Sequence, residues 1–598
     1  MTKEMVTADN KEQTKAKTHS ENSFLEKAND FFCGNGFMTA KDYINMAILT
    51  FLFLILAFFR LGNRYAPVTE FHVDGSTRDI VLDFGNYVDI GQIHMFLGSY
   101  DNRNFSLSAF NEVTGEWQII NGDAKAGSVF TWNDIDVYYN LRYLGIVPRD
   151  EKCSIHEIVV TAPDGTVLSP SYSAECSSLF DEQIMFPKNT TYMDGTYFDE
   201  VYYARTGYEF IHGLKTYETT HPQLGKNIIA FFIRILGMNP YGWRFGSALF
   251  GVLMVPLMYL FTKRLFKNTF VATATTALLS FDFMHFSLSR ICTIDMYVAF
   301  FILFAYYFLY KYFQEDMAYR ATPASLTDSF PPKSVILSLG LSGLGMSLAI
   351  ATKLTGVYAA VGMAVLLLWY TITHKPGKQT LKLGLFCFGV FIILPLILYV
   401  LAYIPVVGDP GYYSGVIDKA YKNTTYMIGY HSNLQAEHYY ASPFYKWPII
   451  WMPLLYALDD IGVTDASAIS CMGNPIIWWI GIPCVFFTIY RWIIKKDKKA
   501  GFLVISYLAQ YVFWFSVGRI TFIYHYFPAI LFTMLMMGYT MNWLLDTFDN
   551  KKVETILKIY VGICIAFFIV YYPVISGLPF LKEWGLHLRL LKDWILVF

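Results

Sequence analysis

Charged residues are scarce in this chain of 598 residues. They account for 16% of the sequence, whereas an average soluble protein contains roughly 25%. Hydrophobic residues make up 55% and aromatic residues 18%, which excludes an ordinary soluble domain and predicts a polytopic membrane protein. The formal charge of −1 identifies no partner, because positive and negative residues are distributed unevenly along the chain.

Cysteines are few, and their positions exclude several kinds of site. The eight cysteines contain no CxxC pair and no metal-ligand spacing, so the sequence predicts no zinc site. Cys153 and Cys176 share one polar segment and could either form a disulfide in an oxidising compartment or remain reduced. The chain also lacks a strong internal repeat, which disfavours a transporter, because many transporter folds are built from repeats.

The N-terminal segment lacks the apolar core of a signal peptide at its start. Residues 1–42 are polar, and the first apolar run ends at Arg60 without a small-residue cleavage site. These features are typical of a retained membrane anchor rather than a cleaved leader. We therefore expect a polar tail over 1–42 and a first transmembrane span over 43–60.

Apolar runs long enough to cross a bilayer, about 17–25 residues each, recur through the chain. Two neighbouring runs at 334–373 are separated only by Ala351, Thr352 and Lys353. The runs predict eleven spans, at 43–60, 242–262, 269–288, 293–313, 334–351, 354–373, 382–403, 475–494, 500–517, 525–545 and 554–576.

Basic residues collect in alternate loops between these spans. If the N-terminus is cytoplasmic, the loops on its side of the membrane are 263–267, 311–333, 375–382, 491–499 and 549–552. Each is rich in lysine or arginine, and the intervening loops are much poorer. Cytoplasmic loops carry such an excess, so the pattern predicts a cytoplasmic N-terminus.

This orientation brings polar residues from separate loops to the outer face of the membrane. Unrelated polar loop residues would divide between the two faces, so the pattern indicates a shared extracytoplasmic site. The alternative is that some of them are solvated or structural, because loops are generally polar. The residues are Asp199, Glu200, His221, Lys226, Arg290, Lys353, His438, Arg519 and His525.

The first outer loop, about 63–240, begins with a segment unlike the rest of the chain. Short alternating runs such as 78–83, 92–96 and 105–110 are divided by turns such as Asn121-Gly122. Strands at such spacing predict a β-sandwich over 65–175. The residues at 81–85, 130–132, 141–144 and 156–158, together with Trp117, resemble the discoidin-type, galactose-binding-like jelly roll. This resemblance implies a module that could bind a glycan; the alternative is a domain that only packs on the membrane part.

Two further segments of the outer loops have patterns of their own. Residues 203–212 and 226–236 have helical spacing and are expected to lie along the membrane interface, with apolar faces in the headgroup zone. The second outer loop, 404–473, contains the aromatic stretch 437–448. This stretch fits an interfacial aromatic belt or a wall on which a sugar stacks.

Asp199 and Glu200 are the most informative residues, because neighbouring carboxylates beside a bilayer are costly. Transfer of a sugar from a lipid phosphate to a hydroxyl needs a base, and a carboxylate within hydrogen-bond reach can serve. Asp199 is the candidate base and Glu200 the alternative. Cations near the leaving phosphate stabilise its charge; the candidates are Arg519, Lys353, Lys226 and Arg290. Taken alone, an Asp-Glu pair is more often the start of a helix or a solvated face.

Over residues 198–530 the chain resembles the protein O-mannosyltransferase family, whose motifs occur here in family order. The matching stretches are Phe198-Asp199-Glu200-Val201, 221–226, Arg244-Phe245 with Gly251 and Val255-Pro256, Ser289-Arg290 with Asp295, 351–356, 438–442 with Trp447-Pro448, 473–479, and Arg519 with 522–526. The family usually has Pro-Pro where this chain has Pro222-Gln223. The β-trefoil MIR domain of eukaryotic members is absent here, so the chain looks like a bacterial-type member.

The resemblance implies a GT-C glycosyltransferase with about eleven spans and an extracytoplasmic site. It implies transfer of mannose from polyprenyl-phosphate-mannose to Ser/Thr hydroxyls of exported proteins, with inversion and with Asp199 as the base. It also implies donor-phosphate or substrate contacts from Lys353, Arg519, Arg290, His221, Lys226, His438, Tyr524 and His525. No metal or other cofactor and no nucleic acid is expected.

Other interpretations stay open at this point. A GT-C transferase could use another lipid-phosphate sugar, or a cell-envelope glycan or lipid as acceptor. A transporter is the alternative from a different class. The expected divisions are a tail at 1–42, a first span at 43–60, a β-sandwich at 65–175, an outer segment with the acidic motif at 176–240, spans 2–7 at 241–403, an outer loop at 404–473, spans 8–11 at 474–577 and an extracytoplasmic tail at 578–598.

Overall fold

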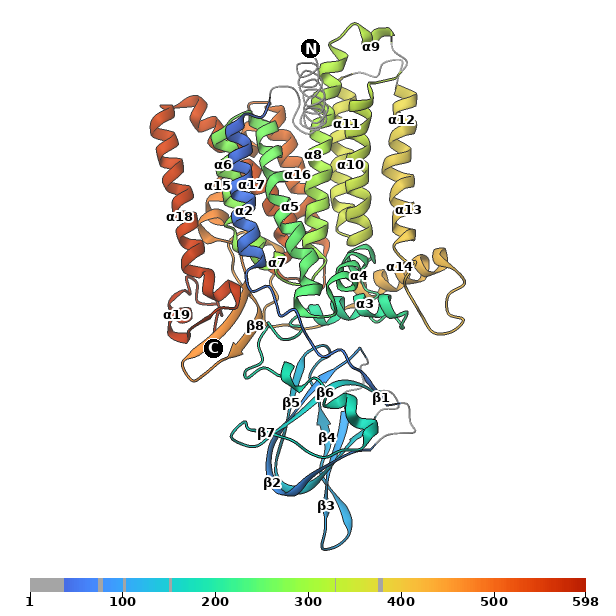
Figure 1. Cartoon of the computed structure of the whole chain (residues 1–598). Helices are drawn as coiled ribbons and strands as arrows, with labels where there is room; N and C mark the ends of the chain where they lie inside the picture. Colours follow the sequence, from blue (N-terminus) through green and yellow to red (C-terminus); the bar gives the residue numbers. More distant parts are fainter. Residues whose placement is uncertain (1–36, 74–78, 100–103, 150–152, 328–329, 375–379) are drawn as a thin grey trace, which may run out of the picture.

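The computed structural model describes residues 37–73, 79–99, 104–149, 153–327, 330–374 and 380–598. A bundle of upright helices stands above a smaller β-rich body, which we call the insert (Figure 1). The tail up to residue 36 and most of the predicted basic loop 375–382 lie outside the described residues.

Within the described residues, nine helical segments are long and apolar enough to span a membrane. A helix satisfies its own backbone hydrogen bonds, which a lipid environment requires. Each segment covers one of the predicted spans. They are α2 (Ala40–Phe58), α5 (Pro240–Phe266), α8 (Asp295–Arg320), α10 (Lys333–Thr352), α11 (Gly356–Thr373), α12 (Thr380–Phe388) continued by α13 (Leu394–Leu401), α15 (Pro475–Ile493), α17 (Phe527–Thr547) and α18 (Asn550–Ser576).

Shorter helices occupy the two remaining predicted spans. α6 (Thr269–Ser280) is followed by α7 (Phe283–Ser289), and α16 (Lys498–Tyr511) by the 3-10 turn Val512–Ser516. Both α6 and α16 lie within the bundle (Figure 1). The total of eleven spans stays a prediction, because these helices have 12 and 14 residues, fewer than the roughly 17 that a full crossing needs.

Successive helices alternate in direction, so each end of the bundle has its own character. The N-terminus of α2 lies on one side of the bundle (Figure 1). The C-terminus of α5 and the N-termini of α10, α16 and α18 lie on the same side. The basic loops of the described chain therefore gather at that end. The opposite end carries α3 (Glu200–His212), α4 (Leu224–Leu236), α14 (Val416–Asn433) and the insert.

α3 and α4 differ in how they meet their surroundings. α4 buries Ile229 and Ile233, while Phe231 and Ile235 are 57% and 61% exposed, as expected of a helix at the membrane interface. α3 instead buries most of its length and contains the buried ion pair of Arg205 with Glu209 at 2.8 Å. α3 therefore packs against protein on most of its surface, and the interfacial position predicted for residues 203–212 stays a prediction.

The insert is one antiparallel sheet with the strand order β1-β6-β2-β5-β3-β4, and β7 pairs with β6. The register places Ala109 of β3 opposite Leu144 of β5. A break in the pairing of β2 with β5 falls between Asp83 and Val88, beside Gly85 with φ = 78°, and such a bulge bends a sheet. The strands are β1 (Phe71–Val73), β2 (Ile80–Leu97), β3 (Asn104–Asn111), β4 (Glu116–Lys125), β5 (Trp132–Pro148), β6 (Cys153–Thr161) and β7 (Val167–Leu168).

The interior of the insert is built from alternating residues of these strands. Leu82, Leu107, Leu144 and Ile155 are fully buried. In a half-buried strand every second side chain faces the interior. Cys176 is a free thiol whose sulfur accepts a hydrogen bond from Ser173. A separate β-rich insert is therefore present, as the sequence predicts; the discoidin-type topology stays a prediction.

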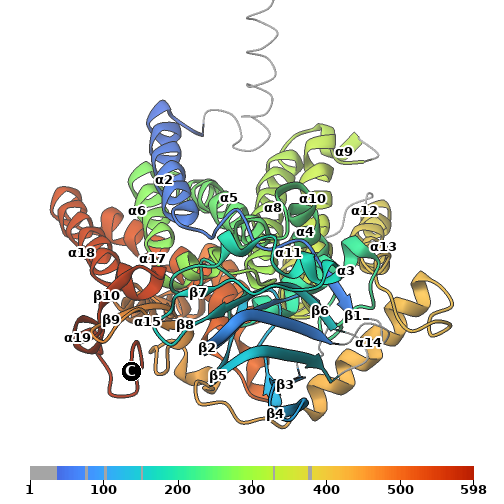
Figure 2. The same ribbon diagram turned by 60° about the horizontal axis from the view of Figure 1, so that its bottom comes forward.

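A second, smaller sheet lies beside the ends of α7 and α18. Its strands are β8 (Leu454–Asp460), β9 (Asp465–Cys471) and β10 (Pro579–Leu581), in the order β10-β9-β8, and α19 (Lys582–His587) follows β10. The second outer loop thus contributes a hairpin that the sequence pattern did not reveal. Seen from the insert side, the large sheet crosses the end of the bundle between α14 and α19 (Figure 2).

Candidate active site

Two adjoining cavities lie among α3, α10, α14 and the segment before α17. Their volumes are about 740 Å³ and about 530 Å³, and we call them the first and the second arm. Both arms are lined by Thr220, His221, Lys353, His431, Leu434 and Arg519. We call these six shared residues the junction, because they connect the two arms.

The two arms differ in chemistry. Beyond the junction, the first arm is lined by Leu354, Val357, Tyr358, Met427, Ile428, Trp514 and Val517, together with the polar residues Thr355, Ser432, Gln435 and Ser516, and contains no carboxylate. The second arm is lined by carboxylates and phenols, namely Asp199, Tyr202, Tyr203, Tyr217, Glu218, Tyr430 and Tyr524. The first arm therefore suits a hydrocarbon chain, and the second suits a ligand rich in hydroxyl groups.

Asp199 precedes α3 and lines the second arm. Phe198 before it has φ = 48°, in the left-handed region that bulky residues rarely adopt, and its ring packs on Tyr456 at a centroid distance of 4.7 Å. Burial and the negative charge of Asp295 raise the pKa of Asp199 to about 7. A carboxyl with this pKa is suited to accept a proton near neutral pH.

Lys353 ends α10 and stands at the junction. Its Nζ lies 2.7 Å from Oδ1 of Asp295, the first residue of α8, and 5.5 Å from the centre of the Tyr524 ring. Asp295 was not among the predicted site residues, although it belongs to the matching stretches. Only the fold reveals its role, because its partner is 58 residues away in the chain.

Glu218 supports the segment that carries Thr220 and His221 into the junction. Its carboxylate forms an ion pair with Lys226, accepts a hydrogen bond from the Thr220 amide at 2.8 Å and lies 3.2 Å from His221 Nδ1. Burial opposes its ionisation, but the positive charge of Lys226 holds the pKa of Glu218 well below its usual range. Lys226 also donates to the carbonyls of Glu218 and His221 and lines neither arm, so in this structure its ammonium group supports the segment; its predicted substrate contact stays a prediction.

His221 and His431 face each other at the junction. Their ring centroids are 5.3 Å apart, and His431 Nε2 donates to the carbonyl of Thr220 at 2.8 Å. Burial lowers the pKa of His221 and lowers that of His431 to about 4. Both rings are therefore neutral near pH 7 and can exchange hydrogen bonds with a ligand without adding charge. His431 was missed by the sequence analysis.

Arg519 supplies a guanidinium to both arms. Its Nη1 donates to the carbonyl of Ile520 at 3.3 Å, and within the described part of the chain no carboxylate forms an ion pair with it. A guanidinium presents several donors in a fork that matches phosphate oxygens. Tyr524 and His525 line the second arm beside it, and His525 packs on Trp514 at a centroid distance of 4.6 Å.

Glu200 points away from the arms and into the bundle. It is fully buried, and its Oε1 accepts from Arg244 Nε at 2.7 Å and from the Cys292 amide at 2.8 Å. Its Oε2 accepts from Arg244 Nη2 at 2.7 Å and from Trp243 Nε1 at 3.3 Å. Such a paired, fully hydrogen-bonded carboxylate holds α3 on α5. The geometry therefore favours Asp199 over Glu200 as the base.

Arg290 and His438 also lie outside the lining of both arms. Arg290 donates to carbonyl groups at the end of α2 and just after it, namely those of Leu56, Ala57, Phe59 and Arg60, and to that of Ser576 at the end of α18. It thus satisfies backbone acceptors that a helix end leaves unpaired. His438 packs edge-on against Phe522 at 5.1 Å. The substrate contacts expected from these two residues stay predictions, and neither residue lines an arm.

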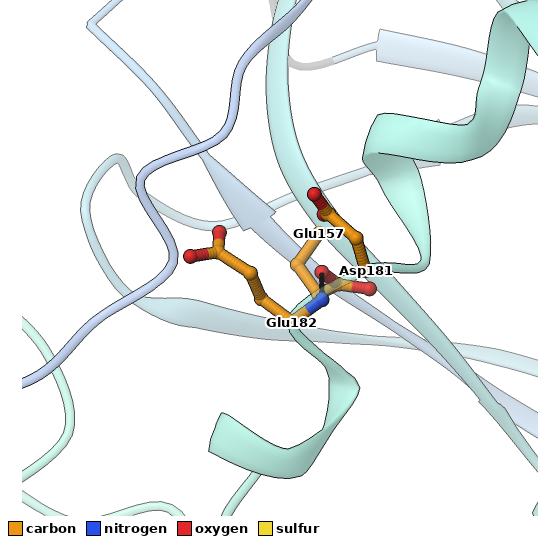
Figure 3. A group of neighbouring side chains, drawn as sticks. All are labelled: Glu157, Asp181 and Glu182. Atoms are coloured by element: carbon orange, nitrogen blue, oxygen red, sulfur yellow. Dashed lines mark hydrogen bonds between the residues drawn. The ribbon is translucent and has the colours of Figure 1, made fainter.

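Two of the carboxylates near the junction are matched by lysines, whereas Asp199 forms no ion pair within the described residues. Asp295 pairs with Lys353 and Glu218 with Lys226, so these groups do not offer a set of vacant oxygen ligands to a metal. A group of three carboxylates that could hold a cation occurs in the insert, at Glu157, Asp181 and Glu182 (Figure 3). That transfer needs no metal stays a prediction.

Two family models match the membrane part of the chain. Residues 234–407 match the model described as dolichyl-phosphate-mannose-protein mannosyltransferase. Residues 417–594 match the C-terminal four-transmembrane region of protein O-mannosyltransferase. The matches contain Lys353, His431 and Arg519 of the junction, whereas Asp199 and His221 precede them.

Curated relatives are similar over a longer region. The polyprenol-phosphate-mannose–protein mannosyltransferase of Mycobacterium tuberculosis is 25% identical over 448 residues, which cover 66% of this chain and 85% of that protein. The protein of the same name from Corynebacterium glutamicum is 22% identical, over 53% of this chain and 69% of that protein. Dolichyl-phosphate-mannose–protein mannosyltransferase 1 of Saccharomyces cerevisiae is 26% identical over 30% of this chain and 24% of that protein.

A solved structure shares the membrane fold. The protein O-mannosyltransferase Pmt1–Pmt2 complex of S. cerevisiae, bound to the sugar donor, has a TM-score of 0.58 and 15% identity, over 67% of this chain and 89% of that chain. The fold is thus of the GT-C type with a β-rich insert. Because the two family models together match more than half of its residues, this chain belongs to the protein O-mannosyltransferase family.

Proposed function

We propose that this protein transfers mannose from polyprenyl-phosphate-mannose to serine and threonine hydroxyls of exported proteins. The observation that carries the proposal is the junction, where Lys353 and Arg519 line both arms while Asp199 lines only the second. An apolar chain, a phosphate, a sugar and an acceptor hydroxyl then each meet a complementary surface in that order. The relatives from Mycobacterium tuberculosis and Corynebacterium glutamicum are named for this transfer.

The first arm is the place for the lipid carrier. Val357 lines this arm, and Val361 and Val365 continue its apolar face along α11, with 42%, 43% and 46% of their surfaces exposed. A polyprenyl chain can therefore leave the arm along α11 without leaving the hydrocarbon layer. Its phosphate then lies at the junction, beside the fork of Arg519 and the ammonium group of Lys353.

In the reaction, Asp199 takes the proton of the acceptor hydroxyl as the oxygen attacks C1 of mannose. The new bond forms between that oxygen and C1, and the bond between C1 and the phosphate oxygen breaks. Its electron pair leaves with polyprenyl phosphate. Lys353 and Arg519 stabilise the negative charge that gathers there, a contribution that is largest in a poorly solvated site.

The carboxylates of the second arm favour a single displacement and hence inversion at C1. Asp199 and Glu218 are the acidic residues that line this arm. Glu218 is occupied by Lys226, Thr220 and His221, which leaves Asp199 for chemistry. A retaining transfer through a covalent intermediate would need a nucleophile as well as a base.

We infer that the arms face the extracytoplasmic side and that the N-terminus is cytoplasmic. The basic loops and the start of α2 gather at one end of the bundle, whereas the arms lie near α3 and α14 at the other (Figure 1). The positive-inside bias then assigns the basic end to the cytoplasm. Labelling of single cysteines introduced into the 491–499 and 578–598 segments of intact cells would test this; labelling of the first segment but not the second would contradict it.

The insert offers a surface on which we propose that a glycan binds. Phe110 packs at a tilted angle against Trp117 and edge-on against Tyr143, at centroid distances of 5.3 and 5.8 Å, and Trp117 is 45% exposed. A Cβ atom at Gly145 would lie 3.1 Å from the Trp117 ring. The indole therefore packs directly against the backbone of Gly145. Sugars stack on such rings. Trp117→Ala should weaken binding of cell-envelope glycans roughly twofold to tenfold; unchanged binding on a glycan array would reject this surface.

The direct experiment is transfer from labelled polyprenyl-phosphate-mannose to a Ser/Thr peptide by the purified protein. Asp199→Asn should reduce the rate by roughly 100-fold or more, the usual contribution of a positioned base. Asp460→Asn is the matched control, because Asp460 is exposed on β8 and pairs with Lys582. Transfer that survives Asp199→Asn would remove Asp199 from the reaction.

A second candidate keeps the donor type and changes the sugar or the acceptor. The apolar first arm and the cationic junction would serve any sugar on a polyprenyl phosphate, and a cell-envelope glycan or lipid could occupy the second arm. A panel of lipid-phosphate sugars and acceptors in the same assay separates the candidates. Preference for a sugar other than mannose, or for a non-protein acceptor, would replace our proposal by this one.

A further inference from the structure

The insert contains a group of carboxylates that the proposed transfer does not use. Glu157 lies on β6, and Asp181 and Glu182 lie in the segment that follows the 3-10 turn Ala174–Leu179. One carboxylate oxygen from each residue lies within 4.8 Å of the others (Figure 3). Among the described residues, no lysine, arginine or histidine forms an ion pair with any of the three.

Glu157 is the member of this group that most needs a partner. Its side chain is 0% exposed, its Oε2 accepts the amide of Glu182 at 2.7 Å, and its Oε1 has no hydrogen-bond partner in the described part of the chain. A buried carboxylate oxygen without a partner is costly and requires an explanation.

We propose that Glu157, Asp181 and Glu182 bind one calcium ion. Calcium takes six to eight oxygen ligands at about 2.3–2.6 Å, so two ligands on opposite sides of the ion lie about 5 Å apart. The separations within this group fall inside that limit. Glu157 provides a buried ligand, while Asp181 is exposed and leaves a path for the ion and for water ligands.

The position of the group gives the ion a structural task. Glu182 Oε2 accepts the amides of Val68 and Thr69 at 2.7 and 3.0 Å, in the segment that enters the insert from α2. The segment that contains Asp181 and Glu182 leaves the insert towards Asp199. The ion would therefore fasten both connections to β6 at one point, and with them the position of the insert against the membrane part.

The test is calcium binding by the full-length protein, purified in detergent, treated with a chelator and titrated with calcium chloride. The wild type should bind one calcium ion per chain with a Kd no weaker than roughly 1 mM, the range of extracellular calcium modules. Glu157→Gln and Asp181→Asn should each weaken binding by at least roughly tenfold. Glu116→Gln is the matched control, because Glu116 is an exposed carboxylate of β4 in the same insert, and it should bind like the wild type.

Thermal unfolding provides a second readout that guards against a misfolded variant. Calcium should raise the Tm of the wild type and of Glu116→Gln, since a ligand that binds only the folded state stabilises it, and should leave the Tm of Asp181→Asn unchanged. Asp181 is exposed, so its substitution leaves the interior of the insert intact. No binding by the wild type at 10 mM calcium, which is about ten times the expected limit, would overturn the proposal. So would wild-type affinity for calcium in both Glu157→Gln and Asp181→Asn. Neither result would bear on the transfer reaction, because no step of it is measured.

Discussion

In the membrane part, Glu200, Glu218 and Asp295 each lie beside an arginine or lysine, whereas in the insert Glu157 has no such cation among the described residues. Both regions bury a carboxylate, but their surroundings differ. Asp282 of the membrane part is also buried without an ion pair among the described residues, but both of its oxygens accept hydrogen bonds, from the amides of Met284, His285 and Asn474 and from the Trp478 indole. One oxygen of Glu157, by contrast, accepts no hydrogen bond in the described part of the chain. The insert stands in water, from which a dissolved cation can enter.

The membrane part itself contains two kinds of buried ion pair. Glu200 and Arg244 are both 0% exposed, and further hydrogen bonds from Cys292 and Trp243 and to the carbonyls of Leu61 and Gly195 complete the pair, as expected of a structural pair. Asp295 and Lys353 are 13% and 7% exposed, and Lys353 lines both arms. The first ion pair therefore stabilises the fold, and the second positions Lys353 at the junction. Substitution of the first pair should mainly lower stability, and substitution of the second should mainly lower the rate of transfer.

The largest expected effect comes from the pair at the junction. Lys353→Met should reduce transfer by roughly 100-fold to 1000-fold, because a cation that stabilises the departing phosphate is lost. The double variant Lys353→Met with Asp295→Asn removes the unpaired charge and should recover thermal stability but not activity. Activity that returns with stability would mean that Lys353 acts only through the fold.

The buried pair of α3 and α5 should respond in stability. Arg244→Met leaves Glu200 without its partner and should cost about 3–5 kcal/mol of unfolding free energy, seen as a lower Tm and a poor yield. Adding Glu200→Gln should restore most of that loss, because no unpaired charge stays buried. The folded double variant should transfer mannose within about twofold of the wild-type rate, because neither Glu200 nor Arg244 lines an arm. A double variant that is stable but inactive would bring Glu200 back as a candidate base.

The smallest effect concerns pH. Only ionised Asp199 can accept a proton, and burial with the charge of Asp295 raises the pKa of Asp199 to about 7. The rate should therefore rise with pH through about 7 and then level off. Asp295→Asn removes a negative neighbour, favours the ionised form of Asp199 and should move this rise to lower pH. A rise that stays in place, or moves to higher pH, would separate the profile from Asp199.

Hydropathy and the ordered motifs predicted much of this molecule. The nine long apolar helices fall on predicted spans, and Asp199, His221, Lys353, Arg519, Tyr524 and His525 all line an arm. These predictions work because an apolar run is a local property and because the motif stretches are short and distinctive. The strands β8 and β9 were not predicted. They are short and lie in a loop rich in aromatic residues.

The sequence did not reveal contacts between residues that are distant in the chain. Lys226 resembles a substrate-binding lysine until Glu218 is placed beside it, and Arg290 resembles a phosphate ligand until the end of α2 is seen to occupy it. Composition and spacing do not record such contacts. His431 was missed for the same reason, because α14 reaches the junction only through the fold.

The left-handed turn at Phe198 has a consequence for how this region can change. Asp199 and Glu200 are adjacent, yet one faces the substrate space and the other is locked to Arg244. Adding or deleting a single residue here would rotate the start of the helix by about 100° and exchange the reactive acid with the anchoring one. The length of this stretch is therefore as strictly constrained as its chemistry, and a family member with an altered spacing at this point should have lost catalysis while retaining its membrane scaffold.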